Sequence, residues 1–199
     1  MTVKQVTYFD KPGPQNTEAL AKAVSERCRE LDIQHIVAAS STGTTALTLW
    51  EAVKDLDVTL VAVPSHAGFR SGDACSLSDE NRRALEEKGI HILVCAHALS
   101  GVARSITRKF GTISHVEIIA QTLKLFGCEG IKVGVEVGVM AADAGLVPTD
   151  REIIAVGGTG RGGDTAIVLK AAHMNNFFDL EVRETIAKPR QRPRTAADA

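Results

Sequence analysis

The sequence predicts an α/β protein built on a largely parallel sheet. Short apolar runs that suit buried strands alternate with segments whose apolar residues recur every three or four positions, as on one face of a helix. This βαβαβ order is typical of a parallel sheet. The last two strong runs, 152–156 and 165–169, are separated by a connection too short for a parallel crossover, so we expect them to pair antiparallel.

The first half of the chain supplies three of the expected strands. Asn16 is placed to cap a helix with an apolar stripe, and the run 35–40 after it reads as a strand. A second helix leads to the strand 58–63. Ser78 can cap a polar helix that ends at a glycine before the strand 90–95.

The second half opens with two helices, the latter starting at a capping box, Ser114 to Glu117. The segment 132–145 is ambiguous, because its valines alternate as in a strand whereas its end reads as the end of a helix; periodicity slightly favours the strand. After the two strong runs, the alternating stretch 178–186 and residues 6–9 are candidates for edge strands.

Length and composition limit the function. The 199 residues suit one domain, and 23 Lys and Arg against 24 Asp and Glu give a net charge of -1, which argues against nucleic acid or an anionic membrane as partner. We expect small molecules or further copies of the chain instead. Residues 1–187 are predicted to form a single α/β domain and residues 188–199 a disordered basic tail.

Several other features bear on location and metal binding. No apolar run approaches the ~20 residues that span a bilayer, and the start lacks a signal-peptide pattern, so a cytoplasmic location is expected. The four cysteines contain no CxxC pair and are expected to be free thiols, each a small buried hydrophobe. Cys95, His97 and His66 fit no standard zinc spacing, and no metal is predicted.

The loop between the strand 35–40 and the next helix is the sharpest local signal. Hydroxyl groups around a glycine at a helix N-terminus offer side-chain donors, free backbone N–H groups and the positive end of the helix dipole, a combination that binds phosphate. The alternative is that the hydroxyls only cap the helix and the glycine only makes the turn. The candidate phosphate loop consists of Ser40, Ser41, Thr42, Gly43, Thr44 and Thr45.

A second candidate loop joins the strands 152–156 and 165–169. It matches GxGxxG, but a strand follows where the dinucleotide fingerprint needs a helix, so that reading is rejected. A glycine-rich hairpin loop that closes over a ligand remains, with Arg161 as its anion clamp; a flexible hairpin turn is the alternative. The loop consists of Gly157, Gly158, Thr159, Gly160, Arg161, Gly162 and Gly163.

These two segments and their flanks resemble the C-terminal domain of pyruvate kinase. The segments HIVAASSTGTTALTLWEAV with VTLVAV, and EIIAVGGTGRGGDTAIVL, are similar to its phosphate-binding and closing halves. Nearly the whole chain resembles the small stand-alone proteins of the pyruvate kinase C-terminal domain-like family, through HAGFR, HALSGV, MAADAGL and AHMN and an FGG-like segment at 110–112.

The resemblance implies a three-layer α/β/α sandwich with strand order 3-2-1-4-5, strand 5 being antiparallel, and a buried helix at 132–145. In that order the strands 35–40 and 152–156 are neighbours at the topological switch point, where open α/β sheets bind ligands beyond the carboxyl ends of their strands. Both loops would open onto that crevice.

Further polar residues follow the other strands at the same edge. They could contact the rest of a ligand, although for any one of them local hydrogen bonding or solvent exposure is the better explanation. They are His66, Arg70, His97, Ser100 and Arg104.

We therefore expect a module that binds a sugar phosphate or a mononucleotide such as flavin mononucleotide (FMN), as a sensor or carrier. The alternative is an enzyme acting on a phosphorylated metabolite, with His66 or His97 as acid or base, although no full catalytic set is recognisable. Pyruvate kinase activity is expected to be absent, because the resemblance places that chemistry in a separate barrel domain. Nucleic-acid binding through the tail is the weakest reading.

Overall fold

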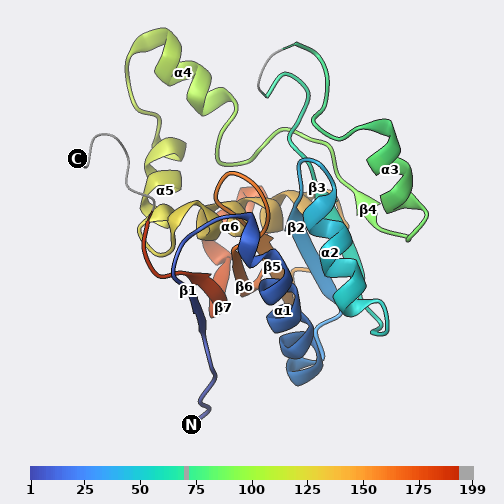
Figure 1. The fold of residues 1–199 in the computed structure, drawn as a ribbon. Coiled ribbons are helices and arrows are strands. Elements are labelled where there is room, and N and C mark those ends of the chain that lie inside the picture. The colour runs from blue at the N-terminus through green and yellow to red at the C-terminus, as the bar shows by residue number, and fades with distance from the viewer. Residues whose placement is uncertain (70–71, 193–199) are drawn as a thin grey trace.

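The computed structural model describes residues 1–69 and 72–192, which form a seven-stranded sheet with helices on both faces (Figure 1). None of the helices in these residues is long and apolar enough to cross a membrane. The strands are β1 (Thr7–Phe9), β2 (His35–Ala39), β3 (Thr59–Val63), β4 (His91–Ile92), β5 (Glu152–Gly157), β6 (Thr165–Lys170) and β7 (Glu181–Pro189). The helices are α1 (Thr17–Leu31), α2 (Thr44–Val53), α3 (Asp79–Glu86), α4 (Val102–Phe110), α5 (His115–Lys124), α6 (Cys128–Asp143) and the 3-10 helices η1 (Pro14–Asn16) and η2 (Met174–Asp179).

The sheet has the order β1-β7-β6-β5-β2-β3-β4. β2 pairs in parallel with β3 and β5, β3 pairs in parallel with β4, and β6 is antiparallel to β5. The predicted order of five strands, with the last one antiparallel, is therefore confirmed. The prediction that the final stretch forms an edge strand is wrong: β7 lies between β6 and β1, because β1 adds in parallel to its last three residues.

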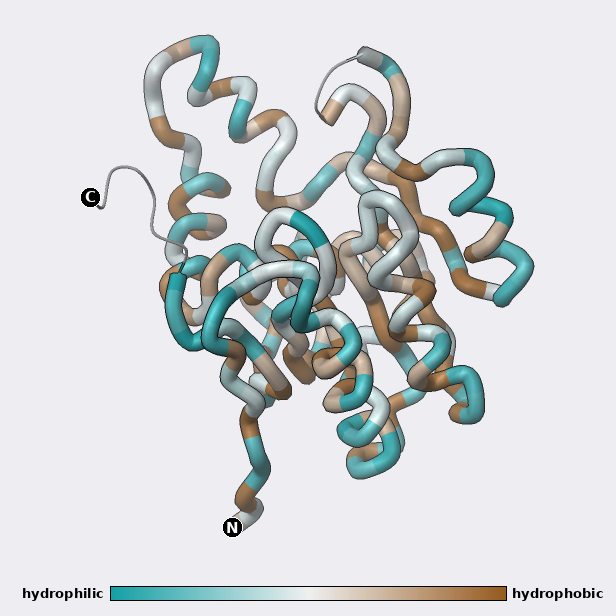
Figure 2. The backbone as a smooth tube through the Cα atoms, viewed as in Figure 1, coloured by the Kyte–Doolittle hydropathy of each residue, from teal (hydrophilic) through white to brown (hydrophobic). Residues whose placement is uncertain are grey.

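Two apolar cores lie on the two faces of the sheet. Ile36 and Ile154 pack in the core under α1 and α2, whereas Val37 and Ile153 pack in the core under α6. Neighbouring strand residues thus alternate between two buried faces. This explains why the sequence shows continuous apolar runs here rather than an alternation of apolar and polar residues. Figure 2 shows apolar and polar residues alternating along the helices that cover the sheet.

The ambiguous segment 132–145 is helical, as the family resemblance implied and the valine alternation did not. α6 is buried along most of its length, so apolar residues surround it and hide the 3.6-residue period. Gly130, Gly134 and Gly138 lie four residues apart on the side facing β6. A Cβ on Gly134 would be 3.2 Å from Ile167 Cδ1, so these glycines let the helix approach the sheet closely.

The predicted positions of the helix N-termini are close to those observed, but one of the three predicted side-chain caps is absent. Ser78 Oγ and Ser114 Oγ accept the N–H groups of Asn81 and Glu117, each at 3.2 Å, as expected of N-caps. Asn16 precedes α1 but does not cap it with its side chain; its Nδ2 donates to the Lys11 carbonyl at 2.8 Å instead.

The observed bounds of β4 and β7 differ from the predicted ones. The strand predicted at 90–95 is reduced to His91–Ile92, and the chain then runs irregularly towards His97. β7 continues to Pro189, two residues past the boundary drawn at 187, and the N–H of Arg190 donates to the Phe9 carbonyl at 2.8 Å. The rest of the predicted tail, 193–199, lies outside the described residues.

The four cysteines are free thiols. Cys28 and Cys128 are buried as expected, but Cys75 and Cys95 are only half-buried. Burial raises the pKa of Cys28 to about 12, so this thiol stays protonated and packs as an apolar side chain. Among the described residues, no three His, Cys, Asp or Glu side chains are grouped so that they could hold a metal ion.

Candidate functional site

The first predicted loop joins β2 to α2 at the carboxyl end of the sheet. Ser40 is only 4% exposed; its N–H donates to the Val63 carbonyl on β3 at 2.9 Å, and its Oγ accepts the N–H of Ala46 at 3.1 Å. The Ser40 side chain therefore satisfies one N–H of the first turn of α2, whose N-cap residue is Gly43. Thr45 is buried as well, at 4% exposed, so these two hydroxyl residues have structural roles.

Three other hydroxyl groups of the loop are exposed. The Oγ1 atoms of Thr42 and Thr44 lie 3.2 Å apart, and Ser41 Oγ shares a hydrogen bond of 2.8 Å with Ser65 Oγ after β3. No described residue accepts a hydrogen bond from the backbone N–H of Thr44. The first turn of α2 thus presents a free N–H beside two hydroxyl groups, at the positive end of the helix dipole.

Helix α3 supports this loop from outside. Asn81 Nδ2 donates to the Thr42 carbonyl at 2.7 Å. Gly43 has a φ of +90°, and a Cβ there would lie 3.3 Å from Leu77 Cδ1. Glycine is therefore needed at position 43 for its backbone conformation and for the tight packing against α3.

The second predicted loop is the connection between β5 and β6, and close packing accounts for several of its glycines. A Cβ on Gly158 would lie 2.1 Å from the Gly162 carbonyl oxygen, and one on Gly162 would lie 2.5 Å from Pro14 Cα. Gly160 has a φ of +84° and no atom within 4 Å of its Cβ position. Arg161, next to it, is exposed, and its N–H donates to the Thr159 carbonyl at 3.2 Å.

Asp164 holds the base of this loop and was missed by the sequence analysis. It is fully buried; its Oδ2 accepts the N–H groups of Gly13 at 3.0 Å and Thr159 at 3.1 Å, and its Oδ1 accepts Thr165 Oγ1 at 2.9 Å. A carboxylate with several donors can stay buried. The only signal in the sequence was an acidic residue between a run of glycines and a strand.

The two loops meet at Gly163. A Cβ on Gly163 would lie 3.1 Å from Thr45 Cγ2 and 2.9 Å from Leu20 Cδ2. The N–H of Gly163 also donates to Thr17 Oγ1 at 3.0 Å. Segments more than a hundred residues apart in the chain are thus in contact at the first turns of α1 and α2.

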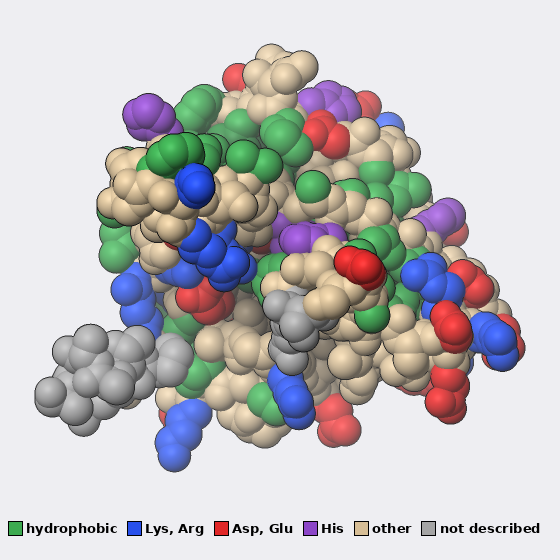
Figure 3. All heavy atoms as spheres, turned by 90° about the horizontal axis from the view of Figure 1, so that it is seen from above, with side chains coloured by type: hydrophobic (Ala, Val, Ile, Leu, Met, Phe, Trp, Pro, Cys, Tyr) green, Lys and Arg blue, Asp and Glu red, His purple; other side chains and the backbone are tan. Residues whose placement is uncertain are grey.

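His66, Phe69 and His97 form a cluster of three rings after β3 and β4. The His66 ring centroid lies 5.0 Å from that of His97 and 5.4 Å from that of Phe69, and the Arg104 guanidinium lies 5.5 Å from the Phe69 ring centroid. Figure 3, which looks onto this end of the molecule, shows histidine side chains in the middle of the face and basic side chains beside them. Arg70, the remaining predicted contact, lies outside the described residues.

A buried ion pair lies behind this cluster. Lys132 Nζ donates to Glu136 Oε2 within α6, and Glu136 Oε1 accepts the N–H of Leu99 at 2.7 Å and Ser100 Oγ at 3.4 Å. Burial lowers the pKa of His97, while the nearby Glu136 carboxylate acts in the opposite direction. Lys132 and Glu136, four residues apart in an otherwise apolar segment, were a signal that the sequence analysis did not use.

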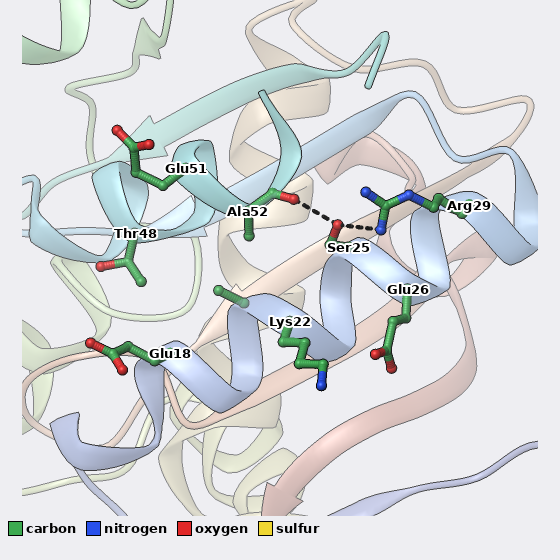
Figure 4. Close-up of a pocket in the computed structure, with 9 residues that line it drawn as sticks. Glu18, Lys22, Ser25, Glu26, Arg29, Thr48, Glu51 and Ala52 are labelled. Atoms are coloured by element: carbon green, nitrogen blue, oxygen red, sulfur yellow. Dashed lines mark hydrogen bonds between the residues drawn. The ribbon is translucent and has the colours of Figure 1, made fainter. Parts of the chain in front are cut away.

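Neither of two cavities in the structure is lined by the two loops. One, of about 450 Å³, is an outer groove between α1 and α2 (Figure 4). There Ser25 Oγ donates to the Ala52 carbonyl at 2.6 Å, among side chains of both charges. The other, of about 60 Å³, lies among Ser100, Arg104 and Lys132. The loops and the ring cluster, rather than a deep cavity, therefore define the candidate site.

Comparison with known proteins gives one match to a family model and several to solved structures. The family model described as "Pyruvate kinase, alpha/beta domain" matches residues 18–169. Among solved structures, Cryptosporidium parvum pyruvate kinase matches with 18% identity and a TM-score of 0.41 over 81% of this chain and 23% of that one. The same enzyme in complex with ADP matches with 19% identity and a TM-score of 0.40 over 80% of this chain and 24% of that one. The chain thus spans about a quarter of the length of these pyruvate kinases.

Proposed function

The chain belongs to the family of the pyruvate kinase alpha/beta domain, and from this premise we propose that it binds a phosphorylated small molecule where its two candidate loops meet. The ligand is a sugar phosphate or a mononucleotide such as FMN, and the protein serves as a sensor or carrier. The observation that carries the proposal is the first turn of α2. There the N–H of Thr44 has no acceptor among the described residues, and the exposed residues Thr42 and Thr44 place their hydroxyl groups 3.2 Å apart.

The physical basis is the match between this turn and a phosphate group. A phosphate carries up to two negative charges and strong acceptor oxygens, and a helix N-terminus supplies N–H donors with positive electrostatic potential. Each hydrogen bond to such a charged group contributes about 1.5 to 3 kcal/mol. Three such hydrogen bonds would contribute about 4.5 to 9 kcal/mol, which is too little for micromolar binding once the cost of association is subtracted, so contacts to the rest of the ligand must contribute as well.

The glycine-rich loop completes the site in this proposal. Asp164 holds its base, while Gly160 and Arg161 form an exposed tip with room to move. Arg161 presents a planar pair of donors that suits phosphate or another anionic group. Closure of the tip would bring Arg161 towards a ligand held at the first turn of α2.

We further propose that the protein does not transfer a phosphoryl group from phosphoenolpyruvate to ADP. The family match and the described fold concern an α/β domain, whereas the resemblance places that reaction in a barrel domain with its own metal and substrate residues. Assaying the pure protein for pyruvate formation tests this directly, and activity above background would refute it.

A second candidate function is an enzyme acting on the bound phosphorylated compound. The ring contact between His66 and His97 favours it, together with the lowered pKa of His97 and the buried Glu136 behind it. A neutral imidazole at neutral pH can accept a proton. Conversion of a bound ligand by wild type but not by a His97→Gln variant would support this function over simple binding.

The binding proposal is tested by calorimetry and by native mass spectrometry of freshly purified protein. FMN is compared with riboflavin, which lacks only the phosphate, and ribose 5-phosphate is compared with ribose. We expect each phosphorylated member of a pair that binds to bind at least tenfold more tightly than its partner. Equal affinity within both pairs, or no binding of any of the four compounds, would refute a phosphate site.

A further inference from the structure

The arm formed by residues 102–126, which comprises α4, α5 and the turn between them, carries an apolar surface that no described part of the chain covers. Each of the two helices contributes a single buried residue, Ala103 in α4 and Ala120 in α5. Figure 1 shows α4 standing away from the sheet and its covering helices. The helical structure of α4 is therefore supported by little packing within the described chain.

Large apolar side chains are exposed along the whole arm. Six of them are more than half exposed and together present on the order of 600 to 800 Å². Apolar patches on monomers usually span a few hundred Å², and a stable interface buries ~800 Å² per partner. The six are Val102 (76%), Phe110 (71%), Ile113 (66%), Ile118 (52%), Leu125 (67%) and Phe126 (63%).

The residues of α4 form an amphipathic pattern, with one apolar face that is typical of a helix packed against another surface. Val102, Ile106 and Phe110 follow at intervals of four residues and so share a face, whereas Arg104 and Arg108 point to the opposite side. A nine-residue helix with one buried side chain is marginal on its own. Covering the Val102–Phe110 face would supply the packing that the described chain does not.

We infer that this surface is the interface between two copies of this chain. Area favours that occupant: the six exposed side chains present about as much surface as each partner of a stable interface buries, ~800 Å². A two-fold dimer buries the same patch twice, so its apolar area is covered on both molecules at once.

The association state of the full chain tests this inference. Sedimentation velocity and light scattering at micromolar concentration should report a dimer for wild type. Phe110→Ser combined with Ile118→Ser, two exposed positions, should raise the dimer dissociation constant at least tenfold, while the far-UV circular dichroism spectrum loses at most the small helical signal of α4. The matched control is Met174→Ser with Phe178→Ser, which removes exposed apolar side chains from η2, outside the arm, and should leave the dimer intact.

Hydrogen exchange gives an independent reading. In wild type, amides of residues 102–126 should exchange more slowly at high than at low protein concentration. A monomeric wild type, with or without binding to vesicles of phosphatidylserine and phosphatidylcholine, would overturn the inference. A dimer that survives the arm substitutions, or that is lost equally in the η2 control, would overturn it too.

Discussion

Gly163 lies so close to Thr45 that a Cβ atom on it would be 3.1 Å from the methyl carbon of that threonine. This contact joins the glycine-rich loop to the first turn of α2. Thr45 is buried beneath it, whereas its neighbour Thr44 is exposed. Of these two adjacent threonines, Thr45 therefore serves packing, whereas Thr44 is available to the ligand that we propose.

Replacing Thr44 with Ala should weaken binding of a phosphorylated ligand without unfolding the protein. The loss of one hydrogen bond to a charged group corresponds to about 1.5 to 3 kcal/mol of affinity, while an exposed substitution changes stability by about 0.5 kcal/mol or less. Titration calorimetry with FMN or ribose 5-phosphate and urea unfolding measure the two quantities. Thr48→Ala, one turn further along α2, is the control and should bind normally; an unchanged affinity for Thr44→Ala would remove this residue from the site.

Arg161 should contribute to affinity but not to stability, because its side chain is exposed at the tip of the second loop. Lysine keeps the charge but loses the planar pair of donors, so Arg161→Lys should retain part of the affinity and Arg161→Ala little of it. In wild type, amides of residues 157–163 should exchange more slowly when the ligand is present. Arg151→Ala removes another exposed arginine and serves as control. Equal binding by all these proteins would mean that the loop is only a turn.

Asp164→Asn should destabilise the protein by about 2 to 4 kcal/mol. The two carboxylate oxygens accept hydrogen bonds from Gly13, Thr159 and Thr165. In asparagine one oxygen is replaced by an NH₂ group, which is itself a donor and would face at least one of these three donors. Chemical denaturation measures the loss. Asp150→Asn, at an exposed position, should be nearly neutral. A neutral Asp164→Asn would show that the three hydrogen bonds do not hold the loop.

The pH dependence of stability should contain a contribution from His97. Burial lowers its pKa in the folded protein below the ~6.5 of an unfolded histidine. Between those two pKa values the unfolded chain binds more protons, so the free energy of unfolding falls as pH drops below about 6.5 and levels off beneath the lowered pKa. Replacing His97 with Gln should make this decline shallower.

His35 and His115 provide the comparison for that experiment. The pKa of His35 is also lowered by burial, so some decline should remain in His97→Gln and should become shallower still when His35→Gln is added. His115 is exposed on α5, and His115→Gln should follow the wild-type curve. Urea unfolding from about pH 7 to about pH 5 measures the free energy of unfolding at each pH. If this free energy fell equally with pH in wild type and His97→Gln, His97 would not contribute to the pH dependence.

The sheet could be predicted from the sequence because its strands are short apolar runs between clear turn signals. The short connection between β5 and β6 alone required the antiparallel pair that the structure contains. α6 could not be read from periodicity, since a helix buried on most sides has no polar face. The family resemblance, rather than local physics, supplied the right answer for that segment.

The candidate site was predictable only in part, for a related reason. The hydroxyl-rich and glycine-rich loops are visible as composition, but which hydroxyls are exposed depends on the packing of Thr45 against Gly163 and of Ser40 against the helix end. Asp164 and Glu136 are single acidic residues whose donors come from distant segments. Tertiary contacts of this kind leave no local pattern.

The position of β7 between β6 and β1 determines when the sheet can be completed during synthesis. β1, at residues 7–9, has as its strand partner only the last three residues of β7, Ala187–Pro189. β1 is made before the other six strands of this sheet and must therefore wait, unpaired, until almost the whole described chain has been made. Loop closure over such a separation is slow, so docking of β1 is expected to be a late event in folding. Until then the edge of β7 that β1 covers is open to strands of other nascent chains.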